Sequence, residues 1–289
     1  MTLQEALAGK RFGVVLSAGF FGFYGHAGFV EAMHEAGLKP HAWAGTSAGG
    51  LVAALAAAGL STQQIREMIL AQRRKDFWDP DPLGIATDLL RKGSRTSGLL
   101  KGGLFRGLLE KHLPARTFAE LKAPLLVVAA NISSQEAEVI TEGDLASAIH
   151  ATCAYPGLFQ VVRRGPSLLW DGGIVDKAPV LALADSAHGK GLEALLVHFL
   201  PSRDGAGDPA GPFAWPSGMA AGMAALRKDH FRLQLELLRA RGIAVHVVTS
   251  RLPAVGPTTM ERGVDALEAA KRSLKQALVS APQSWLGSD

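Results

Sequence analysis

The sequence predicts an α/β fold, a three-layer α/β/α sandwich with a mostly parallel central sheet. The first observation is a set of short apolar runs, each suited to a strand buried on both faces, at residues 12–16, 41–45, 125–130 and 194–200. Helical patterns separate these runs, as the crossover connections between parallel strands require. The chain has 289 residues, of which 48% are hydrophobic, so it can bury a large core. We therefore expect residues 1–289 to form a single domain.

The first expected strand, residues 12–16 (FGVVL), is followed by a loop rich in glycine and aromatic residues, 17–28 (SAGFFGFYGHAG). A helix then extends to about Ala36, and Gly37 ends it. Exposed backbone N–H groups in such a loop can bind either a dinucleotide or the oxyanion formed in acyl transfer. The spacing is not G-x-G-x-x-G, and no suitable acidic residue follows a second strand, so we favour the oxyanion. The candidate donors are Gly19, Phe20 and Gly22.

A sharp turn at residues 44–50 (AGTSAGG) is the most informative stretch of the chain. It places G-x-S-x-G between an apolar strand end and the strongly helix-forming segment 51–58. In such a turn the backbone approaches itself on both sides of the serine, and only Gly45 and Gly49 leave room. The Ser47 hydroxyl would then point out of the sheet above a helix N-terminus, which favours negative charge. Ser47 is therefore a candidate nucleophile, although the motif alone also fits an ordinary glycine-flanked turn.

A second candidate site follows the apolar residues 168–170 (LLW), where Asp171, Gly172 and Gly173 suit an acidic residue at a strand end on a tight turn. An aspartate in such a turn often only satisfies its own backbone. In a cleft of low dielectric it has a raised proton affinity and can serve as a base. Asp171 is therefore a candidate partner for Ser47.

The remaining elements are expected from helical periodicity, capping residues and apolar runs. Ser61 and Gln64 form a capping box for a helix to about Lys75. Residues 84–103 and 203–218, rich in glycine, proline or polar residues, are expected to be loops. Further strands are expected to end at Val139–Ile140 and to span 244–248, with helices at 104–113, 144–153, 219–241 and 259–278.

Composition limits the classes of partner. The net charge is +4, but no block of Lys and Arg resembles an arm that binds nucleic acid, so we expect no nucleic-acid partner. Cys153 is the only cysteine, which argues against a disulfide framework and a zinc-cysteine cluster. Residues 1–10 lack the apolar run of a signal peptide, and no apolar run reaches the roughly 18 residues of a membrane span. We expect a cytoplasmic protein whose membrane contact, if it has any, is peripheral.

Three blocks of the sequence, taken together, resemble the patatin-like phospholipase family: the glycine loop after the first strand, the elbow at 45–49 and the D-G-G turn at 171–173. Pro156 in the segment 151–159 and Pro179–Val180 support the resemblance. It covers about residues 12–200, and we expect residues 201–289 to complete the same domain.

The resemblance implies a patatin-like fold and hydrolysis of lipid esters by a Ser–Asp dyad without histidine. Carried over, Ser47 is the nucleophile, Asp171 takes its proton, and an acyl-enzyme forms and is hydrolysed. The implied substrate is a phospholipid, a lysophospholipid or a neutral lipid, and we expect no metal or cofactor. The family's first block usually reads G-G-G-x-R-G, whereas residues 18–22 read AGFFG. This aromatic loop without arginine is more similar to the neutral-lipid lipases of the family.

Two alternatives remain open at this point. A Ser–His–Asp hydrolase acting on soluble esters would order its triad as serine, acid and histidine, and His188, His198 and His246 lie downstream. His198 lies inside an apolar run, where a core histidine is more usual. A catalytically inactive lipid-binding relative is the second alternative, because a fold alone does not establish activity. The presence of both Ser47 and Asp171 argues against it.

Four aromatic residues of the glycine loop, Phe20, Phe21, Phe23 and Tyr24, lie beside the candidate oxyanion donors. Neighbouring side chains in a loop cannot all face one way. We therefore expect two of the four rings to pack in the core and the others to line an acyl channel.

Overall fold

The structure is a computed structural model that describes residues 1–84, 98–202 and 214–281. Its central sheet has the strand order β10-β9-β1-β2-β4-β8-β7, with β5 paired to β4. The strands from β10 to β4 are parallel, and β5, β8 and β7 are antiparallel to their partners. The strands span Phe12–Leu16 (β1), Ala42–Thr46 (β2), Leu125–Asn131 (β4), Glu136–Ile140 (β5), Val162–Arg164 (β7), Ser167–Asp171 (β8), Ala194–Phe199 (β9) and Ala244–Thr249 (β10). Gly98–Leu100 (β3) and Gly157–Phe159 (β6) form a separate parallel pair.

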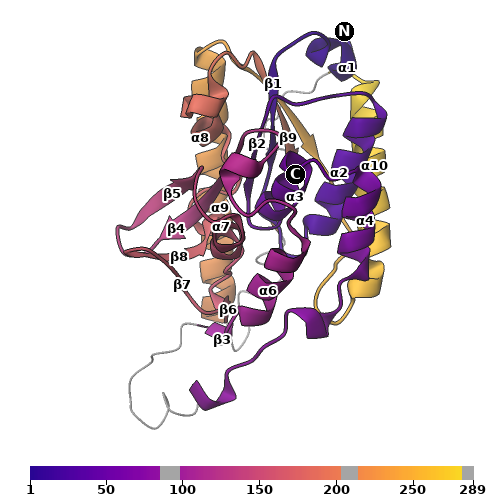
Figure 1. The fold of residues 1–289 in the computed structure, drawn as a ribbon. Helices are drawn as coiled ribbons and strands as arrows, with labels where there is room; N and C mark the ends of the chain where they lie inside the picture. The colour runs from indigo at the N-terminus through magenta and orange to yellow at the C-terminus, as the bar shows by residue number, and fades with distance from the viewer. Residues whose placement is uncertain (85–97, 203–213, 282–289) are drawn as a thin grey trace.

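Helices cover both faces of the sheet (Figure 1). One face packs against α2, α3, α4, α7 and α10, and the other against α8 and α9. Successive strand residues serve opposite faces: Val14 belongs to the first core, and Val15 to the second. The helices span Leu3–Leu7 (α1), Phe23–Glu35 (α2), Ala48–Ala57 (α3), Thr62–Ala71 (α4), Gly103–His112 (α6), Leu145–Thr152 (α7), Val180–Asp185 (α8), Ala214–Ala240 (α9) and Gly263–Leu278 (α10).

The predicted three-layer α/β fold is confirmed, and the expected buried strands begin within one residue of their predicted positions. Several boundaries were wrong. The helix expected to reach Lys75 ends at Ala71, and residues 98–103, expected in a loop, form β3 and the start of α6. Helix α9 begins at Ala214 instead of Met219. The remainder of the two expected loops, residues 85–97 and 203–213, lies outside the described residues.

One edge of β4 is shared by two strands that meet end to end. Val127 and Val128 pair with both β2 and β5, so β2 and β5 must lie on opposite edges of β4. The segment from Ala129 to Asn131 pairs with both β5 and β8, so β8 lies on the same edge as β2. Thr46 is paired with Val128 and Asp171 with Ala129, the next residue along. The register therefore brings the end of β2 against the end of β8.

Thr152, the last residue of α7, fills the gap between these two strand ends. Its hydroxyl accepts a hydrogen bond from the Ser47 N–H (2.9 Å) and donates a short one to the Val128 carbonyl. The side chain is fully buried, so no water replaces these bonds if the hydroxyl is lost. The Thr152 hydroxyl thus bonds to both the Ser47 N–H and the Val128 carbonyl, which have no strand partner where the ladder is interrupted.

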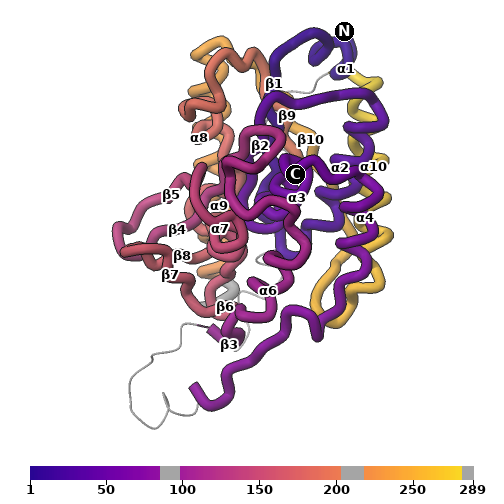
Figure 2. The backbone as a smooth tube through the Cα atoms, in the orientation of Figure 1, coloured from indigo at the N-terminus to yellow at the C-terminus, as the bar shows by residue number. Residues whose placement is uncertain are grey.

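The C-terminal helix α10 packs tightly against α2, the helix that follows the glycine loop. A Cβ at Gly28 would lie 2.0 Å from the Leu267 carbonyl oxygen, and one at Gly263 would lie 2.4 Å from the ring of Tyr24. The Leu3 N–H also donates to the Ser280 carbonyl (2.9 Å), which places α1 beside the end of α10 (Figure 2). Both ends of the described chain therefore support this face.

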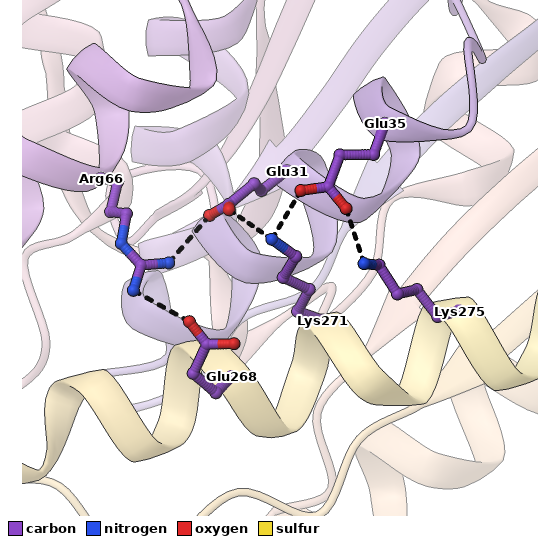
Figure 3. A network of polar contacts seen from close by, with 6 residues as sticks. All are labelled: Glu31, Glu35, Arg66, Glu268, Lys271 and Lys275. Atoms are coloured by element: carbon purple, nitrogen blue, oxygen red, sulfur yellow. Dashed lines mark hydrogen bonds and ion pairs between the residues drawn. The ribbon is translucent and has the colours of Figure 1, made fainter.

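Ion pairs between α2, α4 and α10 surround this contact (Figure 3). Lys271 bonds to Glu31 (2.5 Å) and to Glu35 (2.6 Å). Arg66 of α4 bonds to Glu31 (3.1 Å) and to Glu268 (2.9 Å), and Lys275 bonds to Glu35 (2.7 Å). Isolated surface pairs contribute little, but a network that joins three helices limits how they slide relative to one another.

We expect Thr152→Val to lower the free energy of unfolding by about 2 to 4 kcal/mol, because it leaves a buried N–H and a buried carbonyl without their partner. Thr152→Ser keeps the hydroxyl and removes one methyl group, so it should cost only about 1 kcal/mol. Urea unfolding followed by circular dichroism measures both values. Equal stability of the two variants would contradict the bridging role of the hydroxyl.

Candidate active site

Ser47 lies where β2 ends and α3 begins, in a backbone conformation with φ 54° and ψ −126°. Positive φ is rare for a residue with a Cβ and stores strain. Within the described chain only Phe21 and Gln135 share this feature among non-glycine residues. The strained turn carries the Ser47 side chain into the cavity described below.

The glycines around the elbow and the D-G-G turn are required by close backbone approach. A Cβ at Gly45 would lie 2.6 Å from the Gly49 carbonyl, and a Cβ at Gly49 would lie 2.1 Å from the Leu16 carbonyl oxygen. The same holds at Gly172, where a Cβ would lie 2.0 Å from the Val128 carbonyl oxygen. A Cβ at Gly173 would lie 2.7 Å from the Cβ of Ala18. No side chain fits these positions without a shift of backbone.

Asp171 is 3% exposed, accepts a hydrogen bond from the Gly173 N–H (2.7 Å) and lies close enough to the Ser47 hydroxyl for that group to lower its pKa. Burial raises the pKa of Asp171 to about 6, although both groups and the charge of Arg227 oppose the rise. The serine and the carboxylate expected from the sequence therefore lie next to each other. Near neutral pH such a carboxylate is ionised and still has a substantial affinity for a proton.

The glycine loop lies over the ends of β1 and β9. Its conformation is fixed by bonds from Ala18 N–H to the Lys177 carbonyl (2.7 Å) and from Gly22 N–H to the Gly19 carbonyl (2.8 Å). The Gly22 N–H therefore closes the turn instead of facing a ligand, which weakens Gly22 as an oxyanion donor. For Gly19 and Phe20, the described residues supply no acceptor to either N–H. These two remain the candidate donors in the loop.

A cavity of about 800 Å³ opens over Ser47 and Asp171. Phe20, Phe21 and Phe23 line it, whereas Tyr24 is 1% exposed and packs against Gly263. One ring of the four belongs fully to the core, where we expected two. The other aromatic residues of the wall come from several elements around the mouth: Phe77, Phe105, Tyr155 and Phe159.

His198 belongs to the core, as the apolar run around it indicates. Its Nδ1 hydrogen-bonds to Nδ1 of His26 and its Nε2 to the Ser250 hydroxyl, each at 2.9 Å. His26 also bonds to the Ser17 carbonyl (2.8 Å). Burial lowers the pKa of His26 to about 3 and that of His198 well below its usual range, so both rings are neutral. This pair supports the base of the glycine loop.

The alternative of a Ser–His–Asp triad requires a histidine next to Ser47 and Asp171, and the described residues place none there. Within the described residues, the Asp171 carboxylate bonds to the Gly173 N–H and lies next to Ser47 and Arg227, and no bond joins it to a histidine. Both ring nitrogens of His198 have other partners, and neither His188 nor His246 lines the cavity. The local geometry therefore favours the dyad over the triad.

Four further residues at the site escaped the sequence analysis. Thr152 and Cys153 at the end of α7, Lys177 after the D-G-G turn and Arg227 in α9 all contact the elbow or line the cavity. Burial, together with the nearby charge of Asp171, raises the pKa of the Cys153 thiol well above its usual range, which makes the thiol a poor nucleophile. No motif marks these positions, because each depends on contacts distant in sequence.

Comparison with known proteins identifies a family model and several similar chains. The family model described as patatin-like phospholipase matches residues 14–184. Uncharacterized NTE family proteins of Mycobacterium bovis and Mycobacterium tuberculosis are each 28% identical over 97% of this chain, and this chain spans about half of their length (48%). Lysophospholipase NTE1 of Mycosarcoma maydis is 29% identical over 63% of this chain and 9% of its own.

Among solved structures, VipD from Legionella pneumophila aligns with a TM-score of 0.47 and 15% identity, over 93% of this chain and 67% of its own. Human group IVD cytosolic phospholipase A2 aligns with a TM-score of 0.45 and 12% identity, over 93% of this chain and 59% of its own. The match of the family model extends over more than half of the chain and includes the glycine loop, the elbow and the D-G-G turn. This chain belongs to the patatin-like phospholipase family.

Proposed function

We propose that this protein is a serine acyl hydrolase that cleaves carboxylic esters of lipids by a Ser47–Asp171 dyad. The observation that carries the proposal is the juxtaposition, on one cavity, of the Ser47 hydroxyl on a strained elbow and the buried Asp171 carboxylate, whose pKa burial raises to about 6. That pair opens into a cavity whose wall is largely aromatic and aliphatic. A nucleophile, a base and an acyl-binding surface are thus in one place.

The reaction runs in two halves. Asp171 takes the Ser47 proton as Oγ attacks the ester carbonyl, and the oxyanion lies against the Gly19 and Phe20 N–H groups and the N-terminus of α3. The alcohol leaves with the proton from Asp171, and Ser47 keeps the acyl group as an ester. Water then gives a proton to Asp171, attacks that ester and releases the fatty acid, and Asp171 returns the proton to Ser47.

The apolar cavity wall supports a lipid as the substrate, and the name of the lysophospholipase relative suggests the same class of substrate. Of the helices in the described parts of the chain, none combines the length and the apolar character needed to cross a bilayer. Two aromatic residues of the cavity lining, Phe20 and Tyr155, are 55% and 42% exposed, and their rings lie against each other as an exposed rim. We propose that this rim touches the lipid surface and that the contact is peripheral.

Ser47→Ala and Asp171→Asn should each lower kcat/KM for p-nitrophenyl butyrate by roughly a thousandfold or more, with unfolding curves close to wild type. The double variant should be little worse than either single variant, because the two residues act as one unit. A fluorophosphonate probe should label the wild type and His188→Asn but not Ser47→Ala. A near-native rate in Ser47→Ala would reject the mechanism. Loss of activity in a folded His188→Asn variant would favour a Ser–His–Asp triad over the dyad.

The acid limb of kcat/KM should fall at a pH of about 6, because the base must be ionised and burial raises the pKa of Asp171 to about 6. Activity is expected to be full above this pH and to decline tenfold per unit below it. The groups that face the carboxylate are Ser47, the Gly173 N–H, Arg227 and Cys153. Arg227→Gln should move the limb to higher pH, whereas Arg232→Gln, on the exposed side of α9, should not. A limb near pH 4 in the wild type would contradict the burial of the base.

The third expectation concerns the acyl chain. For p-nitrophenyl esters kept below their aggregation limits, kcat/KM should rise from acetyl towards medium and long chains, by at most about fourfold per CH₂. Phe21→Ala or Phe23→Ala should flatten this slope more than it lowers the acetyl-ester rate, which serves as the internal control. A preference for acetyl esters, unchanged by either substitution, would favour an esterase of soluble substrates.

A further inference from the structure

The cavity carries positive charge on one side. Among its described lining residues, Lys177, Arg227 and Arg251 are cations and Asp171 is the one carboxylate. The lining therefore has a net charge of about +2 at neutral pH when Asp171 is ionised. The glycine loop contributes none of this charge, because residues 17–28 contain no Lys or Arg and His26 is neutral.

Arg227 is the cation next to the base. It projects from α9, and its Nη1 donates to the Gly173 carbonyl (3.2 Å), in the same turn whose N–H holds Asp171. Its charge is close enough to Asp171 to lower the pKa of that carboxyl. The guanidinium therefore lies at the dyad, within reach of a group attached to the scissile ester.

Lys177 and Arg251 are the other two cations of the cavity lining. Lys177 is 5% exposed, and its Nζ bonds to the Ser202 hydroxyl (2.6 Å) above the ring of Phe199. Arg251 follows β10, next to Ser250, and is exposed at the cavity wall. Two hydroxyl groups, from Ser202 and Ser250, also belong to this part of the lining.

Arg227 and the rings of the wall come from different layers of the fold. The cations come from α9 and from segments that follow β8 and β10, whereas the rings of Phe21, Phe77 and Phe105 come from the glycine loop, the segment after α4 and helix α6. The helices α4 and α6 pack on the face opposite α9. Ser47 and Asp171 lie at the strand ends between the layer of Arg227 and the layer of these rings, so a bound amphiphile would have its headgroup towards Arg227 and its acyl chain towards the rings.

We propose that Arg227 and Arg251, with Lys177 behind them, form a subsite for the phosphate of a lipid headgroup, and that the enzyme prefers net-anionic phospholipids to zwitterionic ones. Phosphate gains charge-assisted hydrogen bonds from guanidinium groups. A choline or ethanolamine cation beyond the phosphate would face three like charges. This inference rests on the proposed function, which supplies the class of substrate, but it depends on residues other than Ser47 and Asp171.

The kinetic test compares three monomeric substrates at pH 8, where Asp171 is ionised in wild type and variants: dihexanoyl phosphatidate, dihexanoyl phosphatidylcholine and p-nitrophenyl hexanoate. We expect the wild type to favour the phosphatidate over the phosphatidylcholine by tenfold or more in kcat/KM. Arg227→Gln and Arg251→Gln should each lower the phosphatidate value by a larger factor than the value for the headgroup-free ester, with a loss on the phosphatidate of roughly 10- to 100-fold for Arg227→Gln. Arg227→Lys should recover part of the loss, and Arg232→Gln, with a 56% exposed side chain on the same helix, is the matched control.

An equal loss on all three substrates in Arg227→Gln would show that the residue only positions Asp171 and would overturn the subsite, as would a wild type without headgroup preference. Arg251→Gln keeps the test valid if Arg227→Gln does not fold. The binding of glycerol phosphate, measured against that of dihexanoyl phosphatidate, shows whether the subsite recognises a lipid headgroup or any free phosphate ester. If glycerol phosphate alone binds as tightly as dihexanoyl phosphatidate, the site takes a free phosphate, and the lipid assignment is wrong.

Calorimetric titration of Ser47→Ala with the two phospholipids makes the outcome independent of catalysis. We expect tighter binding of the phosphatidate and loss of this difference in Ser47→Ala/Arg227→Gln/Arg251→Gln. If no ester is hydrolysed but this binding difference is present, the proposed function fails and the subsite stands. If esters are hydrolysed and the binding difference is absent, the subsite fails alone.

Discussion

The site depends on two strands that share one edge of β4. Because β2 and β8 run towards each other along β4 and end at neighbouring positions, Ser47 and Asp171 are brought into contact by the register of the sheet itself. The two residues are far apart in the chain, yet a slip of either strand would separate them and turn its side chains to the other face. The contact is therefore as secure as the pairing of β4 with its neighbours, and loops need not move to form it.

This arrangement includes three features that are unfavourable to the stability of the fold, and other parts of the molecule offset them. The ladder is interrupted at Val128, Ser47 has a strained backbone, and Asp171 is buried with a raised pKa. Thr152 restores hydrogen bonds at the interruption, and glycines remove the clashes. Burial of the neutral His26–His198 pair and the tight packing of α10 on α2 hold the loop above the site. The stability of these surroundings is what allows a strained serine to persist.

Local motifs made the elbow at Ser47, the turn at Asp171 and the buried strands predictable from the sequence, because their residue types are required by neighbours within a few positions. One turn requires both Gly45 and Gly49, and this glycine pattern identifies Ser47 as the residue at its centre. Thr152 and Arg227 make contacts with segments distant in the sequence, so no local motif marks either residue. Gly22 shows the opposite error: its spacing suited a donor, but its N–H is bonded within its own turn. Amphipathic α9 was placed correctly, whereas its start depends on contacts that periodicity does not contain.

The chemistry and the proposed selectivity come from different parts of the chain. Residues matched by the family model supply the glycine loop, the serine and the aspartate, together with Lys177. The later elements β9, α9, β10 and α10 extend the sheet, support α2 and add Arg227 and Arg251 to the cavity wall. A change on α9 can therefore alter the charge that a headgroup meets without moving the strand ends that hold the dyad. Arg227 is where the two parts meet, since its guanidinium bonds to the turn of the base and also lines the cavity.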